Sequence, residues 1–420
     1  MNKVLIITYY WPPSGGAGVQ RWLRFSKYLP EHGWEPVILT IDPKYAAYPV
    51  LDVSLEKDVP KEVKVAKTKA TDWFSFYASD KSKVPSAGFA KTNDNSLKEK
   101  LFRFIRGNFF IPDPRKGWNK FAFRKACEII ESEGISNVIT TSPPHSTQLI
   151  GLKIKKKYPG IKWIADLRDP WTDIYYYEQF YPTIISKRID SCYEKKVLKE
   201  SDRIITVGPS LKSLFSSRLN SKTDKIEVIT NGYDEDDFKG KSHAKPSRFT
   251  ITYVGTLSEK YPIGGFIQAF ISIKITRPDL LLRFVGSIPE NIRGRITSEI
   301  SVDSVEFIPY THHDEAINFM INSSLLLLVI PEHKTNQNIV TGKIFEYIAS
   351  GKPVLCLGPA NGDAANILEE NGFGKCFFYT DVFNIENFIL SVISDPERKQ
   401  TGMDHFSHKN IVKKLVSFLG

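Results

Sequence analysis

The stretch Val340-Thr-Gly-Lys-Ile-Phe-Glu-Tyr-Ile-Ala-Ser-Gly-Lys-Pro-Val-Leu355 has the pattern of a short helix that leads into a buried strand. Its apolar residues recur at the spacing of one helical face: Ile344, Phe345, Ile348 and Ala349. Thr341 and Gly342 are typical of a helix start, and Gly351 of a helix end. Lys343 adds a positive charge to the free N–H groups of that start. The stretch therefore predicts a phosphate or diphosphate site, although a capped surface helix would show the same pattern.

Glu346 lies one turn beyond Lys343 in this expected helix. A carboxylate at that distance from a phosphate-binding lysine can accept hydrogen bonds from two adjacent hydroxyl groups, as on a ribose. A nucleotide would use both residues.

The same stretch resembles the nucleotide-sugar-binding helix of glycosyltransferase family 4 and its relatives in the GT-B fold. In that pattern a helix with a glutamate is followed by Ala-x-Gly-x-Pro-Val and a strand. Here Glu346-Tyr-Ile-Ala-Ser-Gly-Lys-Pro-Val354 occupies it. The resemblance implies that Thr341, Gly342, Lys343 and Glu346 bind the donor.

Length and composition set the limits for the rest of the chain. A chain of 420 residues suits two domains of roughly 200 residues, and a hydrophobic content of 41% supports two sizeable cores. The apolar run at the N-terminus is too short for a signal peptide or a membrane span. The four cysteines show no CxxC pairing or metal spacing, so we expect core thiols in a reducing cytoplasm.

The first expected strand, Val4 to Thr8, runs into a glycine-rich loop and then a helix from about Val19 to Leu29. Glycines let a backbone approach a phosphate at a helix N-terminus, but the spacing is not GxGxxG. The loop resembles the opening of family 4 enzymes, which implies that Gly15, Gly16 and Gly18 contact the donor phosphate and the acceptor.

Polar residues follow two further expected strands, Asn137 to Thr140 and Lys162 to Ala165. His145 lies after the first strand, and Asp166, Arg168 and Asp169 come directly after the second. Open α/β sheets bind their ligands at these carboxyl ends, so the four residues are catalytic candidates facing the acceptor or the sugar. A structural salt bridge would use the same acids and arginine, and a lone loop histidine is more often a surface residue.

Residues 52 to 95 lack periodicity, and we expect an irregular excursion there. Between Ser96 and Lys125, nine basic residues face two acidic ones, a net charge of +7 within a chain of +10. Leu97 to Phe109 reads as a basic amphipathic helix, and four aromatic residues accompany it: Phe104, Phe109, Phe110 and Trp118. We expect Leu97 to Phe123 to bind an anionic membrane surface. A solvated face is the alternative, and no nucleic-acid-binding signature is present.

The second half restarts with a βα pattern of six expected strands: Phe249 to Val254, Leu281 to Val285, Val305 to Ile308, Leu325 to Ile330, Val354 to Leu357 and Cys376 to Tyr379. Lys239 to Arg248 reads as the linker before it. Gly255 and Lys260 match the family's diphosphate-binding loop, with Thr256 in place of the usual arginine. Asn338 stands where the family has an earlier glutamate.

The resemblance implies an α/β protein of the GT-B fold, with two Rossmann-like doubly wound domains facing a central cleft. We expect the acceptor domain at 1–240, the donor domain at 241–404, and a C-terminal helix at 405–420 that returns to the first domain. The implied function is retaining transfer of a sugar from a nucleotide-sugar donor, without a metal or other cofactor. A sugar-nucleotide epimerase and a non-catalytic binding protein are the alternatives.

The expected setting is cell-surface polysaccharide or glycolipid biosynthesis. The acceptor would be a polyprenyl-linked or other membrane-associated glycan. The enzyme would then be cytoplasmic and peripheral on the inner face of the cell membrane, and nucleic acid is not an expected partner.

Overall fold

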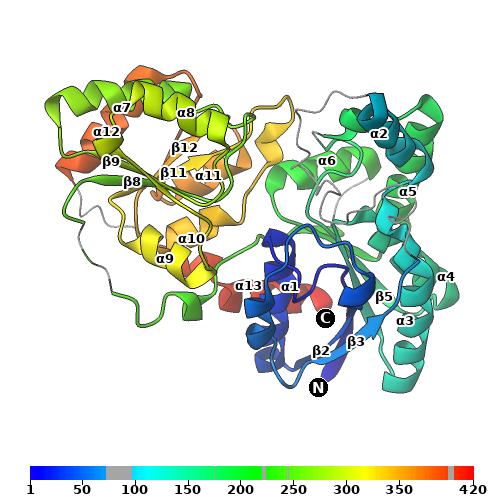
Figure 1. Ribbon diagram of the computed structural model, residues 1–420. Helices are drawn as coiled ribbons and strands as arrows, with labels where there is room; N and C mark the ends of the chain where they lie inside the picture. Colours follow the sequence, from blue (N-terminus) through cyan, green and yellow to red (C-terminus); the bar gives the residue numbers. More distant parts are fainter. Residues whose placement is uncertain (72–96, 175, 220–223, 243, 245, 396–401) are drawn as a thin grey trace. The chain divides into compact units, whose positions relative to one another are not determined.

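The computed structural model describes residues 1–71, 97–174, 176–219, 224–242, 244, 246–395 and 402–420 (Figure 1). The chain divides into two compact units. The first unit comprises Met1–Thr230 and Ile411–Gly420, and the second comprises Asn231–Asn410. The division therefore falls at Thr230, earlier than residue 240, where the sequence placed it.

The first unit is built on a parallel sheet of seven strands in the order β3-β2-β1-β4-β5-β6-β7. The strands are β1 Asn2–Ile7, β2 Trp34–Ile41, β3 Lys64–Thr68, β4 Asn137–Ser142, β5 Lys162–Leu167, β6 Arg203–Thr206 and β7 Ile226–Val228. The chain order reverses between β1 and β4. Loops that follow strands on the two sides of such a reversal diverge and leave room for a ligand.

Helices cover both faces of this sheet. They are α1 Ala17–Tyr28, α3 Asn119–Glu133, α4 Gln148–Lys157, α5 Ile184–Glu200 and α6 Pro209–Leu219, with most of α13 His408–Leu419. Helix α2 Leu97–Phe109 packs instead on α5 and on the turn before it. Val4 and Ile6 of β1 pack against α1 and α13. The alternate residues Leu5 and Ile7 pack against α3 and α4 on the other face. This period-2 division of apolar side chains explains why β1 is buried on both sides.

The second unit repeats the plan with a parallel sheet of six strands in the order β10-β9-β8-β11-β12-β13. Its strands are β8 Thr250–Val254, β9 Leu281–Val285, β10 Val305–Ile308, β11 Leu325–Val329, β12 Val354–Leu357 and β13 Gly374–Phe377. Its helices are α7 Gly264–Thr276, α8 Glu290–Glu299, α9 His313–Ile321, α10 Lys343–Ala349, α11 Asp363–Glu370 and α12 Val382–Ser394. The order reverses between β8 and β11. The six strands expected from the sequence are confirmed, with β13 beginning two residues before the predicted Cys376.

Several expectations about the first unit are corrected. The irregular excursion over 52–95 is wrong where the structure describes it, because Lys64–Thr68 forms strand β3 beside β2; residues 72–95 lie outside the described part. The cysteines are core thiols except Cys192, which is exposed.

Among the described residues, no helix is both long and apolar enough to cross a membrane.

The basic segment is divided between surface and core. The helix expected at Leu97–Phe109 is confirmed as α2. Trp118, however, is 1% exposed, and its indole N–H donates to Thr68 Oγ1 at 2.8 Å. Arg115 is buried too, and its guanidinium donates to the carbonyl oxygen of Ala47. These two residues therefore belong to the fold and not to a membrane-facing surface.

Candidate active site

In the second unit, the candidate site lies where β8 ends next to the chain reversal. Gly255 follows β8 with φ 126°, and Gly286 follows β9 with φ 125°. A Cβ atom on Gly255 would lie 2.4 Å from the Nζ of Lys343, and one on Gly286 would lie 2.5 Å from the carbonyl oxygen of Gly255. Both positions favour glycine because of their positive φ, and at Gly286 the backbone also occupies the space that a Cβ atom would need.

Helix α10 is held at this point by Tyr347. The Tyr347 hydroxyl accepts a hydrogen bond from the backbone N–H of Val254 at 2.9 Å and lies 3.4 Å from the carbonyl oxygen of Leu327, so one side chain connects α10 to β8 and β11. The helix has only seven residues. Its dipole is correspondingly weak, and the case for an anion depends on the side chains around it.

Lys343 points from the start of α10 toward Tyr253. Its ammonium lies 4.7 Å from the centroid of the Tyr253 ring and donates to the Tyr253 hydroxyl at 3.3 Å. Burial lowers the pKa of Lys343 to about 8, and the charge of Glu346 opposes that shift. Tyr253 in turn donates to the carbonyl oxygen of Thr256 at 2.8 Å. Within the described residues Lys343 forms no ion pair.

Thr341 and Glu346 lie on either side of Lys343 in the sequence. The Oγ1 atom of Thr341 is buried and has no hydrogen-bond partner among the described residues. The Oε1 atom of Glu346 lies 3.0 Å from Nε2 of His313 in the first turn of α9. His313 was not predicted as a site residue, although the two adjacent histidines after β10 could have indicated one. A histidine bound to one carboxylate oxygen fixes the orientation of the other.

The remaining donor-binding candidates are more scattered. Gly342 immediately precedes α10. The carbonyl oxygen of Lys260 accepts from the N–H of Glu332, which places Lys260 near the loop after β11. Burial lowers the pKa of His333, and the charges of Lys260 and Lys334 lower it further. None of the contacts of Lys343 is with Lys260. The assignment of both lysines to the diphosphate stays a prediction. Thr256 is exposed, and Asn338 ends a short helical turn after β11.

In the first unit, Asp166 is an interior residue. It is 0% exposed, and its Oδ2 atom accepts from Trp22 Nε1 at 2.7 Å and Thr141 Oγ1 at 2.7 Å. Arg21 of α1 forms a buried ion pair with it at 3.3 Å. Asp166 thus connects β5, β4 and α1. The catalytic role expected of Asp166 stays a prediction.

Arg168 joins the glycine loop to the loop after β4. Its Nε atom donates to the carbonyl oxygen of Ser142 at 2.9 Å, and its Nη1 atom donates to that of Gly18 at 3.2 Å. Gly16 precedes α1 with φ 89°, a conformation that favours glycine. Gly15 donates its N–H to Val50, so this amide is not available to a phosphate. Arg168 therefore holds the loop in place, and its expected catalytic role stays a prediction.

His145 and Asp169 remain as the polar candidates in these loops. The His145 ring stacks on Trp171 with centroids 4.9 Å apart, and neither of its buried nitrogens meets a hydrogen-bond partner in the described part of the chain. Burial lowers the pKa of His145 to about 4, so the imidazole is neutral near pH 7. Burial raises the pKa of Asp169, and Arg168 opposes that shift. A neutral imidazole without partners can both donate to and accept from a sugar hydroxyl.

Trp171, which supports His145, is itself held by a residue that the sequence analysis missed. The Trp171 indole N–H donates to Asp190 Oδ1 at 2.6 Å, and the Tyr177 hydroxyl donates to Asp190 Oδ2 at 3.0 Å. Asp190 lies mid-helix in α5, among basic neighbours, and nothing in its sequence pattern marks it. Among the described residues, no three side chains of His, Cys, Asp or Glu gather as a metal site would require.

Known families match most of the chain. A model described as Glycosyltransferase Family 4 matches residues 85–237, and one described as Glycosyl transferases group 1 matches residues 234–403. No curated protein matches the chain. Two consecutive doubly wound units with these matches define an α/β protein of the GT-B fold. Within that class the chain belongs to the family 4-like glycosyltransferases.

Solved structures share the fold at low sequence identity. A glycosyltransferase from Rickettsia africae has a TM-score of 0.60 and 14% identity, with 100% of this chain and 97% of that chain covered. The Anabaena protein Alr3699/HepE, in complex with UDP and glucose, has a TM-score of 0.61 and 13% identity, with 100% and 99% covered. A putative UDP-N-acetylglucosamine 2-epimerase from Listeria monocytogenes has a TM-score of 0.57 and 12% identity, with 99% and 95% covered.

Proposed function

We propose that this glycosyltransferase moves a hexosyl or N-acetylhexosaminyl unit from a nucleotide-sugar donor to an acceptor, with retention at the anomeric carbon. The observation that carries the proposal is the ammonium of Lys343, which burial destabilises and which has no carboxylate partner among the described residues. A cation in such surroundings is costly unless an anion compensates it. The diphosphate of a nucleotide sugar is an anion of the right kind.

In this proposal, different residues of the second unit bind different parts of the donor. Lys343 binds the diphosphate, and the unpartnered hydroxyl of Thr341 donates to it. Glu346, oriented by His313, accepts from the ribose hydroxyls. Lys260 supplies a further positive charge from its own loop. Because lysines stabilise the charge that develops on the leaving diphosphate, transfer needs no metal ion. The complex of the Anabaena neighbour with UDP supports this class of donor.

The first unit supplies the groups for the sugar and the acceptor. His145 binds a sugar hydroxyl through its unpartnered ring nitrogens, while Trp171 and Asp190 hold its ring in place. Asp169 faces the acceptor. Arg168 fixes the loop of Gly15, Gly16 and Gly18 against the end of β4.

The acceptor is a polyprenyl-linked or other membrane-associated glycan of cell-surface polysaccharide or glycolipid biosynthesis. The basic helix α2 supports this proposal, since a lipid-linked acceptor is reached from the membrane surface. The enzyme then works in the cytoplasm, on the inner face of the cell membrane.

An epimerase is the second candidate, because a putative sugar-nucleotide epimerase shares the fold. It would convert a UDP-sugar without an acceptor. A non-catalytic binding protein is the third, in view of Thr256 and Asn338, which replace an arginine and a glutamate of the family pattern.

A thermal-shift screen of nucleotides and nucleotide sugars tests the donor assignment. A ligand at 100 times its dissociation constant stabilises the folded state by about 2.7 kcal/mol. We expect one nucleoside diphosphate and its sugar conjugates to raise Tm, and nucleosides alone to raise it less. If no nucleotide raises Tm, the proposed donor site is wrong.

A further inference from the structure

The exposed face of helix α5 is more basic than the composition of the helix indicates. Its 17 residues contain five basic and three acidic side chains. Two of the acids face the interior. Asp190 accepts from Trp171 and Tyr177, and Glu194 is 0% exposed and paired with Arg218. Glu200 is the one acid left on the exposed face, against five basic residues: Lys187, Arg188, Lys195, Lys196 and Lys199.

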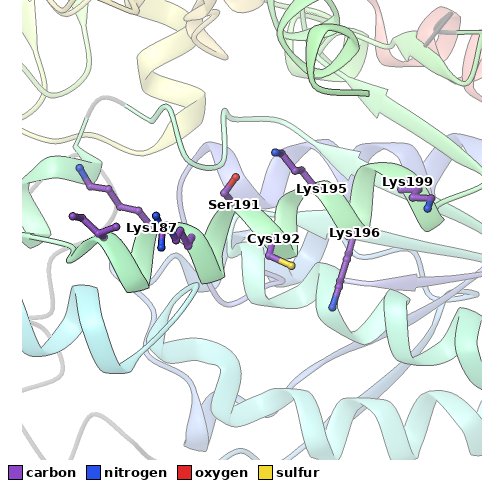
Figure 2. A pocket seen from close by; sticks show the side chains of 8 residues that line it. Lys187, Ser191, Cys192, Lys195, Lys196 and Lys199 are labelled. Atoms are coloured by element: carbon purple, nitrogen blue, oxygen red, sulfur yellow. The ribbon is translucent and has the colours of Figure 1, made fainter. Parts of the chain in front are cut away.

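The basic residues line one continuous hollow along the helix. Figure 2 shows Ser191, Cys192, Lys195 and Lys196 on successive turns of α5. The hollow has a volume of about 520 Å³ and also includes Ile184 and Arg188. Lys187 is paired with the exposed carboxylate of Glu178, at 2.7 Å. Among the described residues, no carboxylate lies within ion-pair distance of the other four basic side chains. They are therefore available to an anionic partner.

The N-terminal end of α5 is strongly apolar and exposed. Ile184 and Ile185 are each 70% exposed, Ile189 is 41% exposed, and Tyr181 just before the helix is 46% exposed. Single exposed apolar residues are ordinary on a protein surface, but four large ones within nine residues form a patch that marks an interaction site. The patch adjoins the basic part of the same helix.

Helix α2 is attached to this same corner of the first unit, as the ribbon also shows (Figure 1). Asn108 makes the attachment: its Oδ1 atom accepts from the N–H of Thr183 at 2.8 Å and from Ser186 Oγ at 2.7 Å. Its amide group donates to the carbonyl oxygen of Tyr181 at 3.1 Å. The C-terminal turn of α2 therefore adjoins the start of α5, and α2 carries exposed apolar residues of its own: Leu97, Leu101, Phe104 and Phe109.

We propose that Tyr181 and α5, together with α2, form a docking surface for an anionic lipid membrane, with α5 lying in the plane of the interface. Ile184 and Ile185 enter the boundary between headgroups and acyl chains, and the basic residues of α5 contact lipid phosphates. A nucleic acid would satisfy the charges but would leave the aliphatic side chains in water. A bilayer interface satisfies both. The proposal rests on the proposed function in assigning the acceptor to a membrane.

Vesicle co-flotation of the full chain, without nucleotide, tests this proposal. Vesicles of phosphatidylcholine mixed with phosphatidylglycerol are compared with vesicles of phosphatidylcholine alone. We expect binding to the anionic vesicles. Each basic residue near an anionic surface contributes about fivefold to partitioning, so Lys195→Gln, Lys196→Gln and Lys199→Gln together should weaken it about 100-fold. The matched control removes three exposed lysines near the other edge of the same sheet: Lys57→Gln, Lys61→Gln and Lys67→Gln.

The apolar part is tested by Ile184→Ser with Ile185→Ser, which should reduce binding about tenfold even at low salt. The control is Ile275→Ser with Val302→Ser, two positions in the second unit that are exposed by 82% and 77%. Cys192 is the one exposed cysteine of the four, so a polarity-sensitive maleimide dye placed there should shift to the blue on anionic vesicles.

Wild-type protein that stays unbound, or binding equally reduced in the control variants, would overturn the docking surface. A nucleotide thermal shift measured on the same samples separates this result from the proposed function. Protein that floats but binds no nucleotide refutes the donor site, and protein that binds nucleotide but never floats refutes the docking surface.

Discussion

The ammonium of Lys343 lies 4.7 Å from the ring centroid of Tyr253 and 3.3 Å from its hydroxyl, where a Cβ atom on Gly255 would displace it. The ring stabilises the cation only partly, and its phenol is committed to Thr256. The second unit thus holds a positive charge at the end of β8 that a bound anion would stabilise further.

Replacing this lysine should affect the phosphates of a ligand and leave its nucleoside part alone. We expect Lys343→Met to weaken nucleoside diphosphate binding by about 1.5 to 3 kcal/mol, the range of a hydrogen bond to a charged group, with little effect on the nucleoside. Isothermal titration of both ligands measures the difference. Lys352→Met, a half-buried lysine just beyond the same helix, is the control, and equal losses for the two ligands would refute the assignment.

The affinity for nucleoside diphosphate should also depend on pH. Burial lowers the pKa of Lys343 to about 8, so the free protein carries the charge below that pH and loses it above. Anion binding favours the protonated lysine, and affinity is therefore kept below pH 8 and falls as the pH rises. Between pH 7 and 9 we expect a loss of about tenfold. The Lys343→Met variant should show a flat profile over this range, and a wild-type affinity that rises with pH would contradict the account.

Substitution of two neighbouring aspartates should affect different properties: stability for Asp166 and the rate of transfer for Asp169. Asp166→Asn leaves Arg21 buried without its counter-charge, and the loss of a buried ion partner costs about 3 to 5 kcal/mol of unfolding free energy. Asp169→Asn should leave stability almost unchanged and lower the rate of transfer. Urea unfolding and initial rates on the two purified variants separate these effects. A normal transfer rate in folded Asp169→Asn would make that residue structural.

The contrast between these aspartates shows where sequence reasoning failed. The strand before Asp166 was predicted to end at Ala165, which put Asp166 in a loop. In the structure β5 continues to Leu167, so Asp166 alternates with its neighbours and points to the face covered by α1. The predicted strand end differs from the observed one by two residues, and Asp166 therefore lies in the strand and not in the loop.

Other features were predictable because they follow local rules. The apolar periodicity of β1 and of the strands of the second half, and the glycines that end helices, determined the two α/β units and the place of α10. Strand β3 was missed because its sequence, Lys64-Val-Ala-Lys-Thr68, is short, polar and half-exposed at a sheet edge. The exposed charge of α5 and the partners of Glu346 and His145 depend on tertiary packing, which no spacing reveals.

The role of His313 provides a further test. Because it contacts only one carboxylate oxygen of Glu346, His313→Ala should disorder that carboxylate and weaken nucleoside binding less than Glu346→Gln does. Adenosine, uridine and guanosine titrations with both variants measure this order. The adjacent His312→Ala serves as the control. If His313→Ala has the larger effect, the histidine contacts the ligand directly and does not act through the glutamate.

The central claim is that this chain transfers sugar from a nucleotide-sugar donor, and a transfer assay tests it most directly. Purified protein is incubated with a panel of radiolabelled nucleotide sugars and a lipid extract, and label is measured in the organic phase and in the released nucleotide fraction. We predict that one donor transfers its label to lipid with equal release of nucleoside diphosphate, and that Lys343→Met abolishes both. Conversion of the donor to its epimer without an acceptor, or no reaction with any donor that the protein binds, would contradict the account.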